Sequence, residues 1–177
     1  MSTLTLAQAK SHLNITGNTH DSDLQDVIDA AEAAISERCG PLSPTTVTAR
    51  IPAAGQLTLP VVPVISLTSV TPVDSSALTI GDLYLDADSG VVEHNSGSTF
   101  SARYYTVVYS AGRSEVPADL LLAVKELVRH LWETRRGSTR RPGSPASESP
   151  TANPGAAYLL PYRVAELIAP HTQVVVG

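Results

Sequence analysis

Apolar residues recur at helical spacing in four stretches of the chain. Within Asp21–Gly40 and Pro117–Gly137 they fall three or four positions apart, which is the period of one face of an α-helix. Shorter stretches with the same spacing follow Thr5 and Pro161. The pattern predicts two helices near the N-terminus, one long helix beginning at Pro117, and a short helix over Pro161–Ile168.

Residues at the ends of these stretches are typical of helix termini. Thr5 with Gln8 three positions later matches a capping box, in which each side chain bonds the backbone N–H of the other residue. Asp21 or Ser22 can cap the second helix. Gly40 can supply the left-handed residue that follows its last turn.

Between residues 41 and 112 the helical spacing stops, and short runs of Val, Thr, Ile and Leu alternate with Pro and Gly. Such runs at near-regular spacing favour antiparallel strands. We expect strands over Thr46–Ile51, Gln56–Leu59, Ile65–Val70, Leu83–Leu85, Gly90–Glu93 and Tyr104–Ser110. The prediction is an α+β fold: a small helical bundle (two N-terminal helices, one long helix, a short C-terminal helix) with an inserted antiparallel β barrel or sandwich.

The same patterns predict how the chain is divided. Residues 1–40 and 113–137 form the expected helical core, and residues 41–112 form the inserted β region. Residues 138–157 are mostly Ser, Pro, Gly, Thr and Ala, which bury too little surface to offset ordering entropy, so we expect a flexible linker. Residues 158–177 regain apolar character and could dock on a partner or on the chain's own β region. We expect their deletion to leave the fold intact but to abolish docking on the partner.

Composition excludes some classes of protein. Of the 177 residues 42% are hydrophobic, enough for a core without disulfide or metal support. The one cysteine, Cys39, cannot form an intrachain disulfide, and we expect it to be a small, partly buried apolar residue. No signal peptide is apparent, and the longest apolar stretch, Leu57–Val73, is interrupted by three prolines. We expect no association with membranes.

The net charge of −5 is unevenly distributed. Residues 1–37 hold six acids against Lys10, and residues 125–141 hold six bases against Glu126 and Glu133. An acidic end and a basic end could support head-to-tail packing of copies in a ring, or they could be two solvated helix faces. The run Arg135–Arg141 could contact DNA phosphates non-specifically, but no aromatic residues for base stacking accompany it. Solvation of the helix end with contacts between subunits is the favoured role.

Residues that carry catalytic or metal chemistry form no motif. The five histidines lack the spacing and the flanking glutamate of a metal pair. The acids between Asp82 and Glu93 miss the EF-hand pattern, because counting from Asp86 the glycine falls at position 5 and position 12 holds no acid. No phosphate-cradling glycine loop or nucleophile elbow occurs. The sequence therefore predicts no enzyme activity, no cofactor and no metal site.

Four segments, in a fixed order, carry a family resemblance. They are the Leu-Thr-Leu-x-x-Ala-Lys-x-His-Leu helix of Leu4–Leu13, the acidic start and terminal glycine of Asp21–Gly40, the junction Tyr105–Gly137, and the closing helix Leu160–Ile168. The junction contains Tyr-x-Ala-Gly, Val-Pro-x-x-Leu and a helix end with an aromatic and Glu-x-Arg (Tyr109, Ala111, Gly112; Val116, Pro117, Leu120; Trp132, Glu133, Arg135). Together they resemble the head–tail connector (adaptor) family of long-tailed DNA bacteriophages. The β region is similar to an insert in some members.

The resemblance implies a structural virion protein without an active site. Such proteins form a ring, typically of twelve copies, between the portal and the stopper or tail-completion protein, where they extend the DNA channel and join head to tail. The implied partners are further copies of the chain, the portal and the stopper, and non-specific contact with packaged DNA is also open. The implied location is the neck of the virion, and the host cytoplasm during assembly.

Two other functions remain open from the residues alone. One is a stopper or tail-terminator subunit of the phage neck, and the other is an unrelated small binding domain. For the connector reading, the expected contacts with partners or ring neighbours lie at the basic helix end and in the C-terminal segment. These residues are Arg129, Arg135, Arg136, Arg140, Arg141, Tyr158, Leu159, Leu160, Tyr162, Arg163, Val174, Val175 and Val176.

Overall fold

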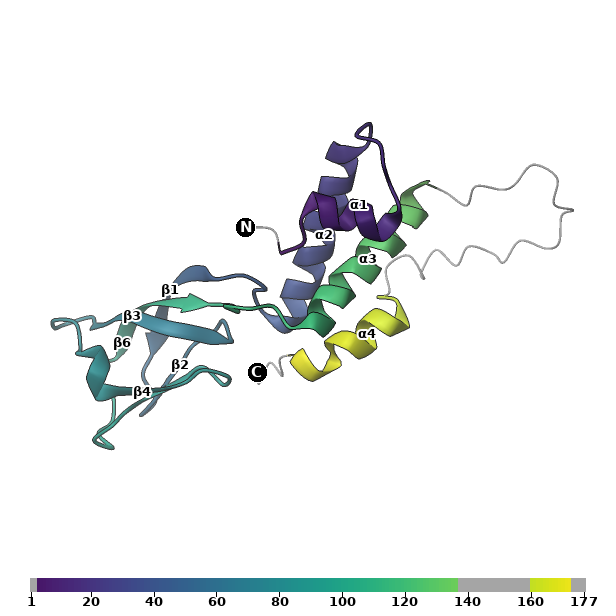
Figure 1. Ribbon diagram of the computed structural model, residues 1–177. Coiled ribbons are helices and arrows are strands. Elements are labelled where there is room, and N and C mark those ends of the chain that lie inside the picture. Colours follow the sequence, from purple (N-terminus) through teal and green to yellow (C-terminus); the bar gives the residue numbers. More distant parts are fainter. Residues whose placement is uncertain (1–2, 137–159, 173–177) are drawn as a thin grey trace, which may run out of the picture. The chain divides into compact units, whose positions relative to one another are not determined.

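The computed structural model describes residues 3–136 and 160–172 of the chain (Figure 1). They divide into two compact units. The β unit comprises residues 36–116, and the helical unit comprises residues 3–35 together with 117–136 and 160–172. The helical unit is therefore built from both ends of the described chain and the β unit from its middle.

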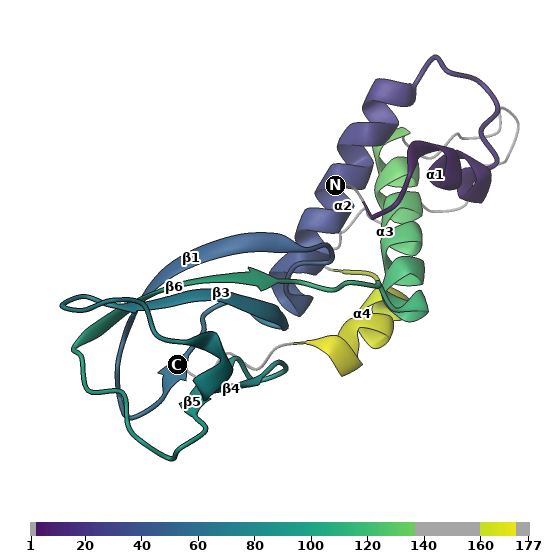
Figure 2. The same ribbon diagram turned by 60° about the vertical axis from the view of Figure 1, so that its left-hand side comes forward.

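Four α-helices occur among the described residues: α1 (Leu6–Leu13), α2 (Asp21–Cys39), α3 (Ala118–Arg136) and α4 (Tyr162–Ile168). A short 3₁₀ turn, Ala169–His171, follows α4. Both α1 and α4 contact α3, and Figure 2 shows α4 lying beside it. The four predicted helices are confirmed, with ends that differ by about one residue from those expected.

Apolar faces of these helices form the core of the helical unit. Every apolar position that the sequence spacing assigns to the second helix is buried: Leu24, Val27, Ile28, Ala31 and Ile35. The buried face of α3 consists of Leu120, Ala123, Val124, Leu127, Val128 and Trp132. Each fully buried Val, Leu or Ile contributes roughly 1.5–3 kcal/mol. Packing of these faces, more than helix propensity, therefore stabilises the unit.

The helix termini are as the sequence predicts, except at the start of α2. The capping box is present: the Gln8 N–H donates to Thr5 Oγ1 at 3.3 Å, and the Thr5 N–H donates to Gln8 Oε1 at 3.0 Å. Gly40 has a φ of 77°, the left-handed conformation expected after α2. However, α2 already begins at Asp21, so the expected cap at Asp21 or Ser22 is wrong by one position. Both residues lie in the first turn instead.

The β unit contains two antiparallel three-stranded sheets. The first has the order β1-β6-β3 and consists of β1 (Thr45–Pro52), β6 (Tyr104–Ala111) and β3 (Val64–Pro72). The second has the order β2-β5-β4 and consists of β2 (Leu57–Thr58), β5 (Val91–His94) and β4 (Leu83–Asp86). A 3₁₀ turn at Ile80–Asp82 leads into β4. All six predicted strands are confirmed, with small shifts of their ends.

The two sheets share one core. Along β6, Tyr105, Val107, Tyr109 and Ala111 are buried, and the residues between them are not. Leu57 and Val92 of the second sheet join the same apolar cluster. The α+β class is thus confirmed, but the described strands form two separate sheets and no closed barrel.

The turn between β4 and β5 explains the acidic sequence there. The Asp86 carboxylate accepts hydrogen bonds from the Ser89 hydroxyl at 2.7 Å and from the Asp88 N–H at 3.2 Å. These bonds lower the pKa of Asp86 below its usual range. Gly90 closes the turn with a φ of 71°, and a Cβ there would lie 2.5 Å from Val62 Cγ1. The acid and the glycine are therefore used to build a tight hairpin.

Candidate interaction surfaces

The described arginines of the predicted contact set lie on the surface of the helical unit. Arg129 and Arg135 project from α3, and Arg163 projects from α4. Each has a carboxylate partner: Arg129 Nε lies 2.9 Å from Glu133 Oε1, Arg135 Nη2 lies 3.2 Å from Asp23 Oδ1, and Arg163 Nη2 lies 4.0 Å from Glu126 Oε1. These cations are thus already matched with acids of the same chain.

The Arg135–Asp23 pair bears on the unequal charge distribution of the chain. Asp23 belongs to the acidic N-terminal part and Arg135 to the basic run, and they meet in one helical unit. Both side chains are about half exposed, and such surface pairs contribute only about 0–1 kcal/mol. The pair therefore has little effect on stability, and it reduces the charge available for a DNA phosphate.

The α4 segment combines an exposed aromatic residue with a buried face. Tyr162 is 79% exposed, the largest exposed fraction among the exposed large hydrophobic residues of the described chain, and Leu160 is half-buried. On the other side of α4, Val164 and Ile168 are buried against the helical unit. Since α4 completes the apolar core, the structure argues against the expectation that residues 158–177 can be deleted without harm to the fold.

A shallow hollow of about 180 Å³ lies between α3 and α4. It is lined by charged and polar residues of α3 and by the start of α4: Glu126, Arg129, His130, Glu133, Pro161, Arg163 and Val164. Three of the predicted contact residues, Arg129, Arg163 and Tyr162, thus lie in or directly beside one surface region. The remaining members of the set are not brought together here.

Several predicted contact residues lie outside the part of the chain that the structure describes. They are Arg140, Arg141, Tyr158, Leu159, Val174, Val175 and Val176. Arg136 is the last residue of α3, but its side chain also lies outside the description. The predicted linker, residues 138–157, falls in the same undescribed part of the chain. Their roles remain predictions.

A hydrogen bond that sequence reasoning missed holds the end of α4 to the start of α3. His171 Nε2 and Asp119 Oδ2 are 2.7 Å apart, and Asp119 also accepts from the Leu120 N–H at 2.8 Å. The bond to His171 is the main reason why the pKa of Asp119 is lowered below its usual range. Only the contact itself could have revealed this pair, because 52 residues separate its members.

The Tyr-x-Ala-Gly segment has a structural role in the β unit. The buried Tyr109 hydroxyl accepts a hydrogen bond from the Val61 N–H at 3.1 Å, and burial raises the pKa of Tyr109. Ala111 is fully buried. Gly112 has a φ of 112°, and a Cβ there would lie 2.3 Å from the Ser43 carbonyl oxygen. The segment therefore fixes the close approach of β6 to the chain that follows α2.

Two further anchors were missed at the sequence level. Glu32 Oε1 accepts from the N–H groups of Thr3 and Leu4, both at 2.7 Å, and so holds the chain ahead of α1 against α2. Arg113 Nη1 donates to the carbonyl of Cys39 at 3.0 Å, at the end of α2. A lone Glu on a helix and an Arg after a glycine give no local signal of such roles. Cys39 itself is fully buried, more deeply than expected.

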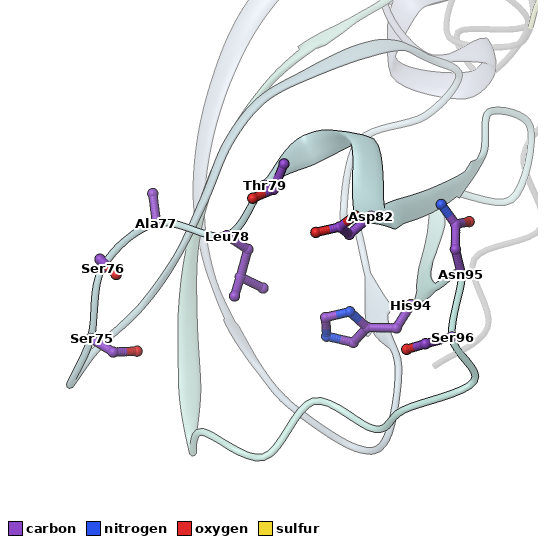
Figure 3. A pocket seen from close by; sticks show the side chains of 9 residues that line it. All are labelled: Ser75, Ser76, Ala77, Leu78, Thr79, Asp82, His94, Asn95 and Ser96. Carbon is purple, nitrogen blue, oxygen red and sulfur yellow. The ribbon is translucent and has the colours of Figure 1, made fainter.

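The β unit carries an open, polar hollow of about 710 Å³ (Figure 3). Its lining consists of two stretches of chain, Ser75–Thr79 and His94–Ser96, together with Asp82. Figure 3 shows the side chains of Leu78, Asp82 and His94 directed toward the hollow from different elements. The His94 ring packs against the Phe100 ring, with 4.4 Å between the two ring centroids. Four of its nine lining residues carry small hydroxyl side chains: Ser75, Ser76, Thr79 and Ser96.

No group of three or more His, Cys, Asp or Glu side chains in the described chain is placed to hold a metal ion. Among the helices that the structure describes, none is long and apolar enough to cross a membrane.

A family model and two solved structures are similar to this chain. The model of the head completion protein family matches residues 2–174. A chain in the neck of an empty GTA particle, computed with C6 symmetry, is 22% identical with a TM-score of 0.68, and the alignment covers 98% of this chain and 92% of that one. A chain in the neck of a native GTA particle, computed with C12 symmetry, is also 22% identical, with a TM-score of 0.66 and the same coverage. No curated protein matches this chain.

At this identity the solved structures establish a shared fold, and the family match, which spans nearly the whole chain, establishes membership. The resemblance drawn from the four sequence segments is thereby confirmed. This chain belongs to the head completion protein family.

Proposed function

We propose that the chain is a ring-forming subunit placed between the portal and the stopper, where it extends the DNA channel and joins head to tail without catalysing a reaction. The observation that carries this proposal is the family match over residues 2–174. It is supported by similar folds in two neck assemblies computed with C6 and C12 symmetry. A ring of twelve copies is compatible with both symmetries.

Contacts within the neck are proposed to involve the exposed face around α4. Tyr162 is a large aromatic residue that leaves most of its surface in water, and such residues are enriched in protein interfaces. Arg163 and Arg129 flank it beside the hollow between α3 and α4. Because Arg129, Arg135 and Arg163 face carboxylates of their own chain, contact with protein is favoured over contact with DNA. The portal is the proposed partner of this face.

Imaging of the purified chain with the portal protein of its own particle tests the proposal. The wild-type chain is expected to add a ring to the portal in negative stain. Tyr162→Ala combined with Arg163→Ala is expected to lower portal binding at least about tenfold, as loss of an interface anchor does. Asp26→Ala, which removes an exposed charged side chain of α2 outside that face, is the control and should bind normally.

Two outcomes would overturn the assignment. Absence of any ring, with or without the portal, would contradict the ring-forming role. Cross-linking of the chain to the tail tube with none to the portal would replace it with the stopper or tail-terminator role.

A further inference from the structure

The first sheet of the β unit carries a cluster of two arginines around a tyrosine on its outward side. The Arg50 guanidinium lies 4.6 Å and the Arg103 guanidinium 5.5 Å from the centroid of the Tyr104 ring. Both arginines are exposed, and Tyr104 is partly exposed. A guanidinium within about 6 Å of a ring centroid is held by the ring's negative face and keeps its N–H donors available. We call these three residues the basic cluster.

The basic cluster differs from the arginines of the helical unit. No carboxylate of the described residues lies within ion-pair distance of Arg50 or Arg103. Two positive charges that lie beside the Tyr104 side chain, with no carboxylate within ion-pair distance, form a surface that attracts a negatively charged partner. Such a partner could be DNA or an acidic protein face.

The net charge of the β unit favours an acidic protein face over DNA as the partner of the basic cluster. Residues 36–116 contain seven Asp and Glu residues against four arginines and no lysine, so the β unit as a whole is negative. A polyanion such as DNA is repelled by that net charge, whereas a small acidic patch on a protein meets only the local cluster.

An acidic face of suitable chemistry is present on the second sheet of the same unit. Tyr84 of β4 pairs directly with Glu93 of β5, and both side chains are exposed, with Tyr84 at 58%. Asp86 lies two residues beyond Tyr84 on the same side of β4, and Asp88 follows it in the exposed turn. We call Tyr84, Asp86, Asp88 and Glu93 the acidic face.

The basic cluster and the acidic face lie on opposite sides of the β unit. The buried side chains of both sheets belong to one core between the sheets, so the exposed side chains of each sheet point away from the other. Figures 1 and 2 agree, with β1, β6 and β3 along one side and β4 along the other. A head-to-tail ring needs two different, complementary patches on each copy. The β unit presents such a pair.

We propose that the basic cluster of one copy binds the acidic face of the next copy, which gives the β unit a ring contact distinct from the portal contact proposed for α4. This inference rests on the proposed ring, since only neighbouring copies bring the two patches together. Arg50 and Arg103 bond the carboxylates of Glu93 and Asp88, and Tyr104 and Tyr84 add aromatic surface between them.

Site-directed cross-linking of the full chain tests the contact. Cys39 is buried, so engineered surface cysteines are the thiols that react in the folded described chain. The double variant Arg50→Cys/Glu93→Cys, assembled with the portal and treated with a short bismaleimide, should give a ladder of linked oligomers. Either single variant should stay essentially unlinked, because a head-to-tail contact never places a patch against itself. Arg50→Cys/Thr99→Cys, with Thr99 exposed outside both patches, is the matched control.

A charge exchange tests the electrostatic basis. Arg50→Glu/Arg103→Glu and Asp88→Arg/Glu93→Arg should each lower ring yield about tenfold or more, because like charges then meet. Combining all four substitutions should restore it. Rings that form normally without the ladder, or a four-fold variant that stays as weak as its parents, would overturn this contact and leave the ring proposal standing. Absence of wild-type rings would instead overturn the proposed function and this contact with it.

Discussion

Gly112 shows how a single residue of this chain is dictated by its surroundings. Its φ of 112° is a conformation that residues with a side chain rarely adopt. The space for a Cβ is also filled, because the Ser43 carbonyl oxygen would lie 2.3 Å away. Strain and overlap therefore act together at this position, and the overlapping atom is backbone that cannot swing aside.

Gly112→Ala is expected to destabilise the β unit by at least about 2 kcal/mol, since strained φ values and overpacking each cost about 1–3 kcal/mol. Gly97→Ala is the matched control, because Gly97 also has a positive φ, 74°, but has open space around it. Urea denaturation followed by far-UV circular dichroism gives both free energies of unfolding. Equal losses in the two variants would show that the contact with Ser43 adds nothing.

At the scale of elements, two contacts hold α4 in the helical unit. Val164 and Ile168 bury its inner face, and the hydrogen bond between His171 and Asp119 ties the turn after it to the first turn of α3. Its outer face keeps Tyr162 in water. The same short helix thus contributes to the core and offers a surface to a partner, which explains why deletion and surface substitution should have different effects.

The Asp119–His171 bond predicts an acid-sensitive contribution to stability. Since the pKa of Asp119 is lowered in the folded chain, the bond stabilises above the ordinary carboxyl pKa of 3.8, and this contribution is lost as the pH falls below that value. Asp119 is 40% exposed, so solvent screening limits the effect to about 1 kcal/mol or less.

Asp119→Asn should therefore lower the denaturation midpoint near about pH 5, where the carboxylate is charged, and the difference from wild type should shrink progressively as the pH falls below 3.8. Asp26→Asn removes an exposed carboxylate of α2 and controls for the general loss of one negative charge. Thermal denaturation of the three proteins across this pH range is the measurement. A constant difference between wild type and Asp119→Asn at all pH values would contradict the prediction.

At the scale of the whole molecule, residues far apart in sequence close the helical unit. Its described parts come from residues 3–35, 117–136 and 160–172. The last of these is needed to cover α3, because α4 brings two buried aliphatic side chains, each worth roughly 1.5–3 kcal/mol. Loss of the C-terminal part should therefore destabilise the whole helical unit.

Deletion of residues 158–177 is expected to lower the melting temperature of the helical unit, whereas deletion of residues 173–177 alone should leave it unchanged. The single Trp132, 5% exposed on α3, is the reporter. Its fluorescence should shift to longer wavelength and unfold earlier in the longer deletion only. Identical melting curves for both deletions would restore the original expectation that the segment is dispensable.

The sequence by itself determined the elements of this protein. Helical spacing in Asp21–Gly40, the capping box of Thr5 and Gln8, and the Asp86–Gly90 turn are all local, so residues a few positions apart carry the full signal. The order of four segments also identified the family, which the comparisons confirm. These elements could be predicted from neighbouring residues alone, without knowing which faces pack together.

Only the tertiary structure decided what meets across the chain. The order β1-β6-β3 pairs strands that are distant in sequence, and Arg135 meets Asp23 across 112 positions. The burial of α4, the bond from His171 to Asp119 and the placement of the basic cluster opposite the acidic face are of the same kind. Periodicity predicts whether a side chain faces the core or the solvent. The residues that it contacts are determined by how whole elements pack together. Roles for the charged residues could be proposed only from the structure, because packing pairs some of them and leaves others exposed.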